Sequence, residues 1–166
     1  GRIFEYTGPG VGTLTAPERM TITNMGTELG ATSSLFPTDD RTREYLEQVG
    51  RPEEFVELQP DEDAEYHDSL TVDLSELEPL IAEPSMPDNV VPVREAAGTE
   101  VDQVIIGSCT NGAFEDILPA AKMLEGRSLD MSTEMIVAPG SKKASEMLAR
   151  GGWTAELMAA GVNFSE

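Results

Sequence analysis

The segment Val104-Ile-Ile-Gly-Ser-Cys109-Thr-Asn-Gly112 organises this chain, because it reads as a short buried strand that runs into a glycine-flanked turn. A helix is expected directly afterwards, over Phe114 to Leu124. Open α/β sheets bind their ligands where such a strand ends and a helix begins. Backbone N–H groups at the start of the helix favour negative charge and would stabilise a thiolate. Cys109, the only cysteine of the 166 residues, is therefore a candidate metal ligand, nucleophile or redox thiol.

The residues after position 98 alternate between short apolar runs and amphipathic segments. Such alternation predicts a mostly parallel sheet with helical crossovers, which places the chain in the α/β class. The expected strands are Val104 to Ile106 and Met135 to Ala138, and the expected helices are Phe114 to Leu124, Lys142 to Arg150 and Thr154 to Ala160.

The first sixty residues predict one strand and two helices. A strand is expected over Ile3 to Tyr6, and the capping-box pattern of Thr15 and Glu18 starts a helix that should reach about Leu29. Apolar residues at spacings of three and four would form its buried face. These residues are Ile22, Met25 and Leu29. A second helix should run from Arg41 to Val49.

The stretch from Gln59 to about Thr99 has a looser pattern and contains five of the eleven prolines. Only Ser69 to Val72 suggests a strand there. This stretch is expected to be an extended connection between parts of two domains, residues 1–90 and residues 98–166.

The charge excludes several classes of function. The formal net charge is −20, and residues 51–100 contain 15 acidic side chains against two arginines. Such a surface repels nucleic-acid phosphates. No apolar run approaches the ~18 residues of a membrane span. A single cysteine allows no internal disulfide, which suits a reducing, cytoplasmic compartment. The acidic run Asp61 to Glu65 is interpreted as a solvated loop, because a calcium loop of the EF-hand type would need a central glycine.

Two further observations bear on catalysis. The only histidine, His67, lies in the acidic connection, so a cysteine hydrolase with a Cys–His pair is not favoured. Asn24 and Glu28 are four residues apart and would share one helix face. Taken alone, such a pair is typical of a solvated helix edge.

Two motifs carry a resemblance to a known family. The segment Met20 to Pro37, MTITNMGTELGATSSLFP, and the segment Gly107 to Gly112, GSCTNG, together resemble the aconitase superfamily of iron–sulfur hydro-lyases. Asp73 to Pro79 and Ala138 to Ser141 follow in the family's order, so the resemblance covers nearly the whole chain. The sequence from Gly30 to Ser33 resembles that of aconitases more than that of isopropylmalate dehydratases.

The resemblance implies a fold of three-layer α/β units, and it implies roles for individual residues. Cys109 would ligate one iron of a [4Fe–4S] cluster, and Ser108, Thr110 and Asn111 would lie against this cofactor. Glu28 would handle a proton of the water or hydroxyl on the labile iron, and Asn24 would hydrogen-bond near the cluster. The substrate would be a small tricarboxylic or dicarboxylic hydroxy acid.

The implied reaction is the interconversion of citrate and isocitrate through cis-aconitate, as in the tricarboxylic acid cycle. The alternative within the family is a homoaconitate or isopropylmalate dehydratase.

The chain also departs from the family. The family's Cys-x-x-Cys pair is absent, as are its substrate-binding arginines and the serine base of its mobile last domain. One cysteine cannot hold a cluster that needs three. We therefore expect an internal segment of a larger hydro-lyase that is inactive and binds no cluster by itself, with the remaining domains as its partners. Two rivals from other classes are a stand-alone acidic binding module and a redox thiol protein that uses Cys109.

Overall fold

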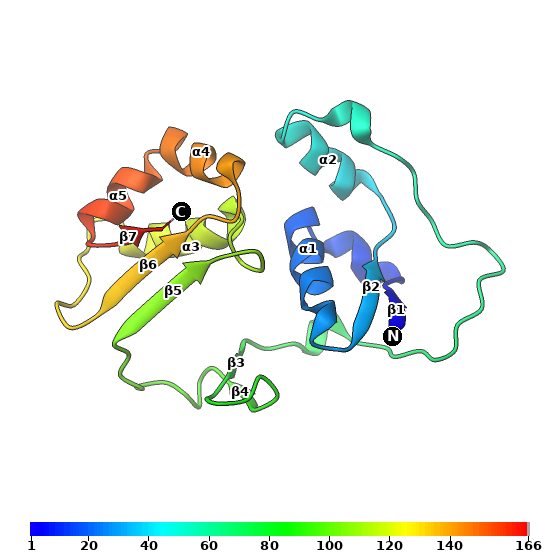
Figure 1. Cartoon of the computed structure of the whole chain (residues 1–166), viewed down its shortest axis with the longest axis horizontal. Helices are drawn as coiled ribbons and strands as arrows, with labels where there is room; N and C mark the ends of the chain where they lie inside the picture. The colour runs from blue at the N-terminus through cyan, green and yellow to red at the C-terminus, as the bar shows by residue number, and fades with distance from the viewer. Residues whose placement is uncertain (166) are drawn as a thin grey trace. The chain divides into compact units, whose positions relative to one another are not determined.

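The computed structural model in Figure 1 describes residues 1–165. By their contacts these residues divide into two compact units. The larger unit consists of residues 1–62 and 102–166, and the smaller unit consists of residues 63–101. Two of the three sheets within residues 1–165 are parallel, and helices connect their strands, so the predicted α/β class with mostly parallel sheet is confirmed. The division into domains at 1–90 and 98–166 stays a prediction.

The C-terminal part of the larger unit is a three-stranded parallel sheet with the order β5-β6-β7. Figure 1 shows its strands beside three helices. The strands are β5 (Gln103–Gly107), β6 (Glu134–Ala138) and β7 (Asn163–Phe164), and the helices are α3 (Phe114–Leu124), α4 (Lys142–Arg150) and α5 (Trp153–Ala159). The five elements predicted from the alternating pattern are confirmed to within about one residue at each end. The pattern gave no sign of β7, which has only two residues.

Apolar side chains from the sheet and from all three helices form one core. Ile117 of α3, Leu148 of α4 and Leu157 of α5 are fully buried against Met135 and Val137 of β6. Burial of a leucine or isoleucine contributes about 1.5–3 kcal/mol relative to exposure. This core therefore holds the ends of β5 and β6 in a fixed position.

The N-terminal part of the larger unit is a two-stranded parallel sheet. Strand β1 (Arg2–Glu5) pairs with β2 (Ala31–Leu35), and α1 (Ala16–Asn24) lies between them in the chain. Helix α2 (Asp40–Gln48) follows, with Asp39 as its N-cap. The predicted β1 and α2 are confirmed, whereas β2 escaped prediction because its sequence Ala-Thr-Ser-Ser-Leu has no apolar pattern.

Helix α1 begins as predicted and ends earlier than predicted. The Thr15 hydroxyl accepts from the Glu18 N–H, and the Glu18 carboxylate accepts from the Thr15 N–H at 2.7 Å, which is the expected capping box. The α-helix ends at Asn24, and a 3₁₀ turn over Met25–Thr27 follows it. The predicted buried face is wrong, because Met25 is 41% exposed and Leu29 is 65% exposed.

The buried side of α1 is built around a charged residue instead. The guanidinium of Arg19, which is 5% exposed, donates to the carbonyl oxygens of Val11, Leu14 and Pro37 and pairs with the Asp39 carboxylate at 2.5 Å. Four acceptors from two segments, residues 11–14 and 37–39, thus converge on one cation. Periodicity of apolar residues cannot reveal such a polar centre.

The smaller unit has little regular structure. Strands β3 (Leu80–Ala82) and β4 (Val90–Pro92) form an antiparallel hairpin, and Leu74–Glu76 form a 3₁₀ turn. The strand expected over residues 69–72 is wrong, because these residues take no regular structure and Leu70 is 89% exposed. Two further 3₁₀ turns, Pro9–Thr13 and Pro52–Glu54, belong to the larger unit. Across residues 1–165, no helix combines the length and the apolar character that crossing a membrane requires.

Candidate functional site

The turn after β5 contains two consecutive residues with positive φ, a glycine and a serine. Gly107 has φ 141° and Ser108 has φ 70°. A β-carbon at Gly107 would lie 1.9 Å from the carbonyl oxygen of Ala138 at the end of β6. The Ser108 N–H donates to that same oxygen at 3.0 Å. A non-glycine residue with positive φ is uncommon and often marks a functional turn.

A second close approach joins this turn to the turn after β6. The Gly140 N–H donates to the Gly112 carbonyl oxygen at 2.8 Å. A β-carbon at Gly112 would lie 2.4 Å from both the Gly140 nitrogen and the Ser108 oxygen. The two turns therefore pack backbone against backbone, and Gly112 and Gly140 are required by this contact.

The start of α3 is fixed by a side chain within the helix. Ala113, the N-cap residue, has no side-chain acceptor, and its N–H donates to the Asp116 carboxylate at 2.9 Å. The Asn111 amide donates to the other oxygen of the same carboxylate at 3.4 Å. Asn111 is thus tied to the helix, and the carboxylate satisfies donors at the helix N-terminus.

Cys109 lies exposed in this turn, beside the last residue of α1. Hydrogen bonds from Asn24 in the first place and from Thr110 in the second lower the pKa of the Cys109 thiol from its usual value, against a smaller opposing effect of burial. The Thr110 hydroxyl also donates to Asn24 Oδ1 at 2.7 Å. The structure therefore brings together Cys109, Thr110 and Asn24, which the sequence predicted for one site.

The hydrogen-bond chemistry of this group sets the direction of the Asn24 amide. Thr110 has one hydroxyl proton, so it can donate to Asn24 or to the thiolate, not to both at once. When Thr110 donates to Asn24 Oδ1, the Nδ2 end of the amide remains free to donate to Cys109. A thiolate beside such an amide donor is suited to bind a soft metal ion or to act as a nucleophile.

Glu28, the other predicted catalytic residue, is not joined to this group. It lies in the turn after α1, where it is exposed, and no hydrogen bond within residues 1–165 links it to Asn24, Thr110 or Cys109. The helix ends at Asn24, so the spacing of four no longer places the two side chains on one face.

One residue of this region escaped the sequence analysis. The Thr21 hydroxyl donates to the carbonyl oxygen of Thr110 at 3.0 Å. A threonine in a helix carries no pattern that distinguishes this contact from an ordinary exposed hydroxyl.

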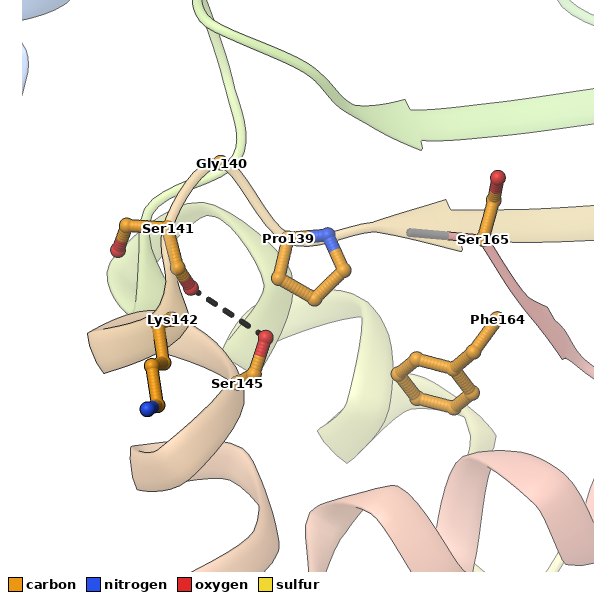
Figure 2. Close-up of a pocket in the computed structure, with 7 residues that line it drawn as sticks. All are labelled: Pro139, Gly140, Ser141, Lys142, Ser145, Phe164 and Ser165. Atoms are coloured by element: carbon orange, nitrogen blue, oxygen red, sulfur yellow. Dashed lines mark hydrogen bonds between the residues drawn. The ribbon is translucent and has the colours of Figure 1, made fainter.

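A shallow hollow lies at the start of α4 (Figure 2). The Ser141 hydroxyl caps the helix by accepting from the Ala144 N–H at 3.1 Å, and the Ser145 hydroxyl donates to the Ser141 carbonyl oxygen at 3.3 Å. Figure 2 shows Phe164 and Ser165 among the other lining residues, with Lys142 at the helix start. None of the predicted site residues is among the lining residues of this hollow. Gly140, which lines it, donates to the Gly112 carbonyl oxygen in the Cys109 turn.

The described residues can supply part of a metal site. No group of three or more histidine, cysteine, aspartate or glutamate side chains in residues 1–165 could hold a metal ion. The exposed thiol of Cys109 with its lowered pKa has the chemistry of one soft ligand. A complete cluster site needs thiolates that this sequence does not contain.

These features define an α/β protein in which the turn at the end of a parallel strand carries an exposed thiol with a lowered pKa. Comparison with known proteins then identifies the family. The sequence profile of the Aconitase family (aconitate hydratase) matches residues 1–100 and 94–166, so the chain belongs to the aconitase family, as the resemblance implied.

Individual relatives show the same relationship. The chain is similar to the 3-isopropylmalate dehydratase large subunit of Lachnoclostridium phytofermentans, with 44% identity over 84% of this chain and 33% of the relative. It is also similar to 3-isopropylmalate dehydratase large subunit 2 of Archaeoglobus fulgidus, with 41% identity over 86% of this chain and 34% of the relative. The 2,3-dimethylmalate dehydratase large subunit of Eubacterium barkeri is 38% identical over 99% of this chain and 39% of the relative. The chain thus spans about a third of the length of the curated relatives it matches.

Proposed function

We propose that this chain is part of a hydro-lyase that dehydrates and rehydrates a small hydroxy acid of the isopropylmalate type. The observation that carries the proposal is the hydrogen bond from the Thr110 hydroxyl to Asn24 Oδ1, because it joins the two family motifs next to the exposed thiol of Cys109. The names of the relatives favour a branched dicarboxylic substrate. Citrate, the substrate first expected from the sequence, is less favoured.

A second candidate substrate is the citrate and isocitrate pair. The segment Gly30 to Ser33 and the dipeptide Phe36-Pro37 resemble the aconitase wording of this motif. Gly30 has φ 77°, which explains why a glycine stands at this position, but its conformation does not distinguish the substrates.

The mechanism assigns distinct tasks to three residues. Cys109 would supply one thiolate ligand to a [4Fe–4S] cluster, and the other ligands would come from outside this sequence. When bound, such a cluster with an open iron position supplies a Lewis acid for the substrate hydroxyl and carboxylate. Asn24 would hold the Cys109 sulfur by donating from Nδ2. In the dehydration, Glu28 would donate a proton to the departing hydroxyl, which leaves as water, and it would take a proton back from water in the reverse hydration. A base from outside this sequence would accept the proton of the neighbouring carbon.

The partners follow from the same proposal. The relatives are named large subunits, so we include a further polypeptide or domain in the complete enzyme. Residues outside this sequence, from the rest of the polypeptide or from that partner, would complete the cluster ligands and the substrate pocket. The net charge of −20 argues against nucleic acid as a further partner.

A substrate assay tests the proposal. The complete polypeptide that carries this segment is expressed with its partner, reconstituted anaerobically with iron and sulfide, and assayed with 3-isopropylmalate, 2,3-dimethylmalate and citrate. We expect the highest kcat/KM with one of the two branched acids. The highest value with citrate would favour the second candidate, and no turnover with any hydroxy acid would contradict the hydro-lyase assignment.

A further inference from the structure

Thr21 makes an unusual hydrogen bond for a threonine inside a helix. The hydroxyl of such a residue commonly donates to the carbonyl three or four residues earlier. Thr23 of the same helix does so, and its hydroxyl lies 3.0 Å from the carbonyl oxygen of Met20. Thr21 instead donates to the carbonyl oxygen of Thr110, also at 3.0 Å, across 89 positions of sequence. This bond ties the middle of α1 to the turn that carries Cys109.

Thr110 is consequently held at two points by one helix face. Its carbonyl accepts from Thr21, and its hydroxyl donates to Asn24 Oδ1 at 2.7 Å. Thr21 and Asn24 are three residues apart, so both side chains project from the same face of α1. The two bonds act together as a clamp on Thr110, and Thr21 is the member of the clamp that does not touch Cys109.

The clamp determines which end of the Asn24 amide faces the sulfur. With Oδ1 occupied by the Thr110 hydroxyl, Nδ2 is the end of the amide that can donate to the neighbouring Cys109. The reversed amide would place an oxygen lone pair against a thiolate, which is repulsive. A small displacement of the Thr110 backbone would release the hydroxyl from Oδ1 and let the amide rotate.

We propose that Thr21 is a positioning residue of the hydro-lyase site, which holds the Thr110 carbonyl so that the Thr110 hydroxyl keeps the Asn24 amide nitrogen directed at the Cys109 sulfur. The inference rests on the proposed function for its catalytic consequence. The orientation itself is a property of this chain and can be measured without a cluster.

Matched variants separate this role from general stability. Thr21→Val removes the tethering hydroxyl and keeps the β-branched shape, Thr21→Ser restores the hydroxyl, and Thr23→Val removes a comparable hydroxyl that bonds only within α1. Thr110→Val removes the hydroxyl that contacts Asn24 and keeps the carbonyl that accepts from Thr21. Thr110→Val therefore tests the bond between Thr110 and Asn24, and it replaces Thr21→Val as the test if Thr21→Val does not fold.

The first measurement is the side-chain amide signal of Asn24 in nitrogen-15 NMR spectra of the 166-residue chain. Thr21→Val and Thr110→Val should shift this signal and speed its exchange with water about two- to tenfold, the factor that one net hydrogen bond is worth. Thr21→Ser should resemble the unmodified chain, and so should Thr23→Val. Equal spectra for Thr21→Val and Thr23→Val, or a Thr21→Ser spectrum that resembles Thr21→Val, would overturn the inference.

The second measurement uses the complete, cluster-loaded enzyme. Thr21→Val should lower kcat about two- to tenfold at unchanged iron content and unchanged KM, and Thr21→Ser should recover most of that loss. An unchanged kcat in Thr21→Val would refute the catalytic consequence. If the enzyme turned over no hydroxy acid at all, the proposed function would fail, while the NMR measurement would still decide whether Thr21 orients Asn24.

Discussion

Replacing Arg19 by methionine should destabilise the larger unit strongly. Methionine keeps most of the apolar stem, so the change removes chiefly the charge and its donors. Removal of one partner from a fully buried ion pair costs about 3–5 kcal/mol. The Asp39 side chain is 32% exposed, which lets water replace part of the lost interaction, but the carbonyl oxygens of Val11, Leu14 and Pro37 lose a donor as well. We therefore expect a loss of about 2–3 kcal/mol in the free energy of unfolding.

Asp39→Asn is the matched variant for this measurement. Asparagine caps a helix about as well as aspartate, so α2 should persist, and Arg19 keeps its three carbonyl partners. The expected loss is about 1 kcal/mol. Urea unfolding followed by circular dichroism gives both values, and hydrogen exchange of the Thr42 amide, which donates to Asp39, reports the local effect. A loss below about 0.5 kcal/mol for Arg19→Met, or a larger loss for Asp39→Asn, would refute the reasoning.

The same pair predicts a pH dependence. Burial acts to raise the pKa of Asp39, but the hydrogen bond from Arg19, the backbone N–H of Thr42 and the Arg19 charge outweigh it and leave the pKa below its usual value. The folded state thus favours the ionised carboxyl. Its stabilisation is fully present above the unfolded pKa of about 3.9 and is lost as the pH falls through the lower folded value. The stability difference between the unmodified chain and Asp39→Asn should be constant above about pH 5 and shrink below about pH 4.

Three further predictions concern the site. Gly107→Ala should lower the free energy of unfolding by roughly 3 kcal/mol or more, because its β-carbon would lie 1.9 Å from the Ala138 oxygen. The control Gly126→Ala, at φ 67° with open space around it, should lower it by only about 1–2 kcal/mol. Similar losses for the two variants in urea unfolding would contradict the close contact at Gly107. The midpoint of the pH dependence of Cys109 alkylation should lie at a lower pH than for an ordinary thiol, and Asn24→Ala should move this midpoint upward, because it removes the largest cause of the lowered pKa. An unchanged midpoint in Asn24→Ala would contradict this cause. In the complete enzyme, Glu28→Gln should slow turnover about 10²- to 10⁴-fold at unchanged iron content, because glutamine cannot take and return a proton, and full activity per cluster would refute the assigned role.

Local sequence signals predicted the C-terminal elements well, because the strands and helices there depend on clear periodicity and on one apolar core. Ile117 and Leu148 are fully buried in that core. The prediction failed where tertiary contacts outweigh periodicity. The buried face of α1 is organised by Arg19 and not by Met25 or Leu29, and a polar centre of this kind leaves no apolar pattern in the sequence.

The site was predictable as a set of residues and not as a geometry. The glycines around Cys109 and the family motif indicated the turn, and the structure adds that Gly107 and Gly112 are required by contacts with the next turn. The contact between Asn24 and Thr110 spans 86 positions, so no local pattern could reveal it. The prediction that Glu28 shares a helix face with Asn24 failed for a different reason. A spacing of four implies a shared face only while the α-helix continues, and α1 ends at Asn24.

Iron content of the complete enzyme tests the central claim most directly, with Cys109→Ser beside the unmodified protein. A serine oxygen is a poor replacement for a soft thiolate on iron. We expect Cys109→Ser to lose iron and sulfide after anaerobic reconstitution, and to lose hydro-lyase activity in the same proportion, while the circular dichroism of the protein is unchanged. Full iron content and full activity in Cys109→Ser would show that Cys109 ligates no cluster and would contradict the account.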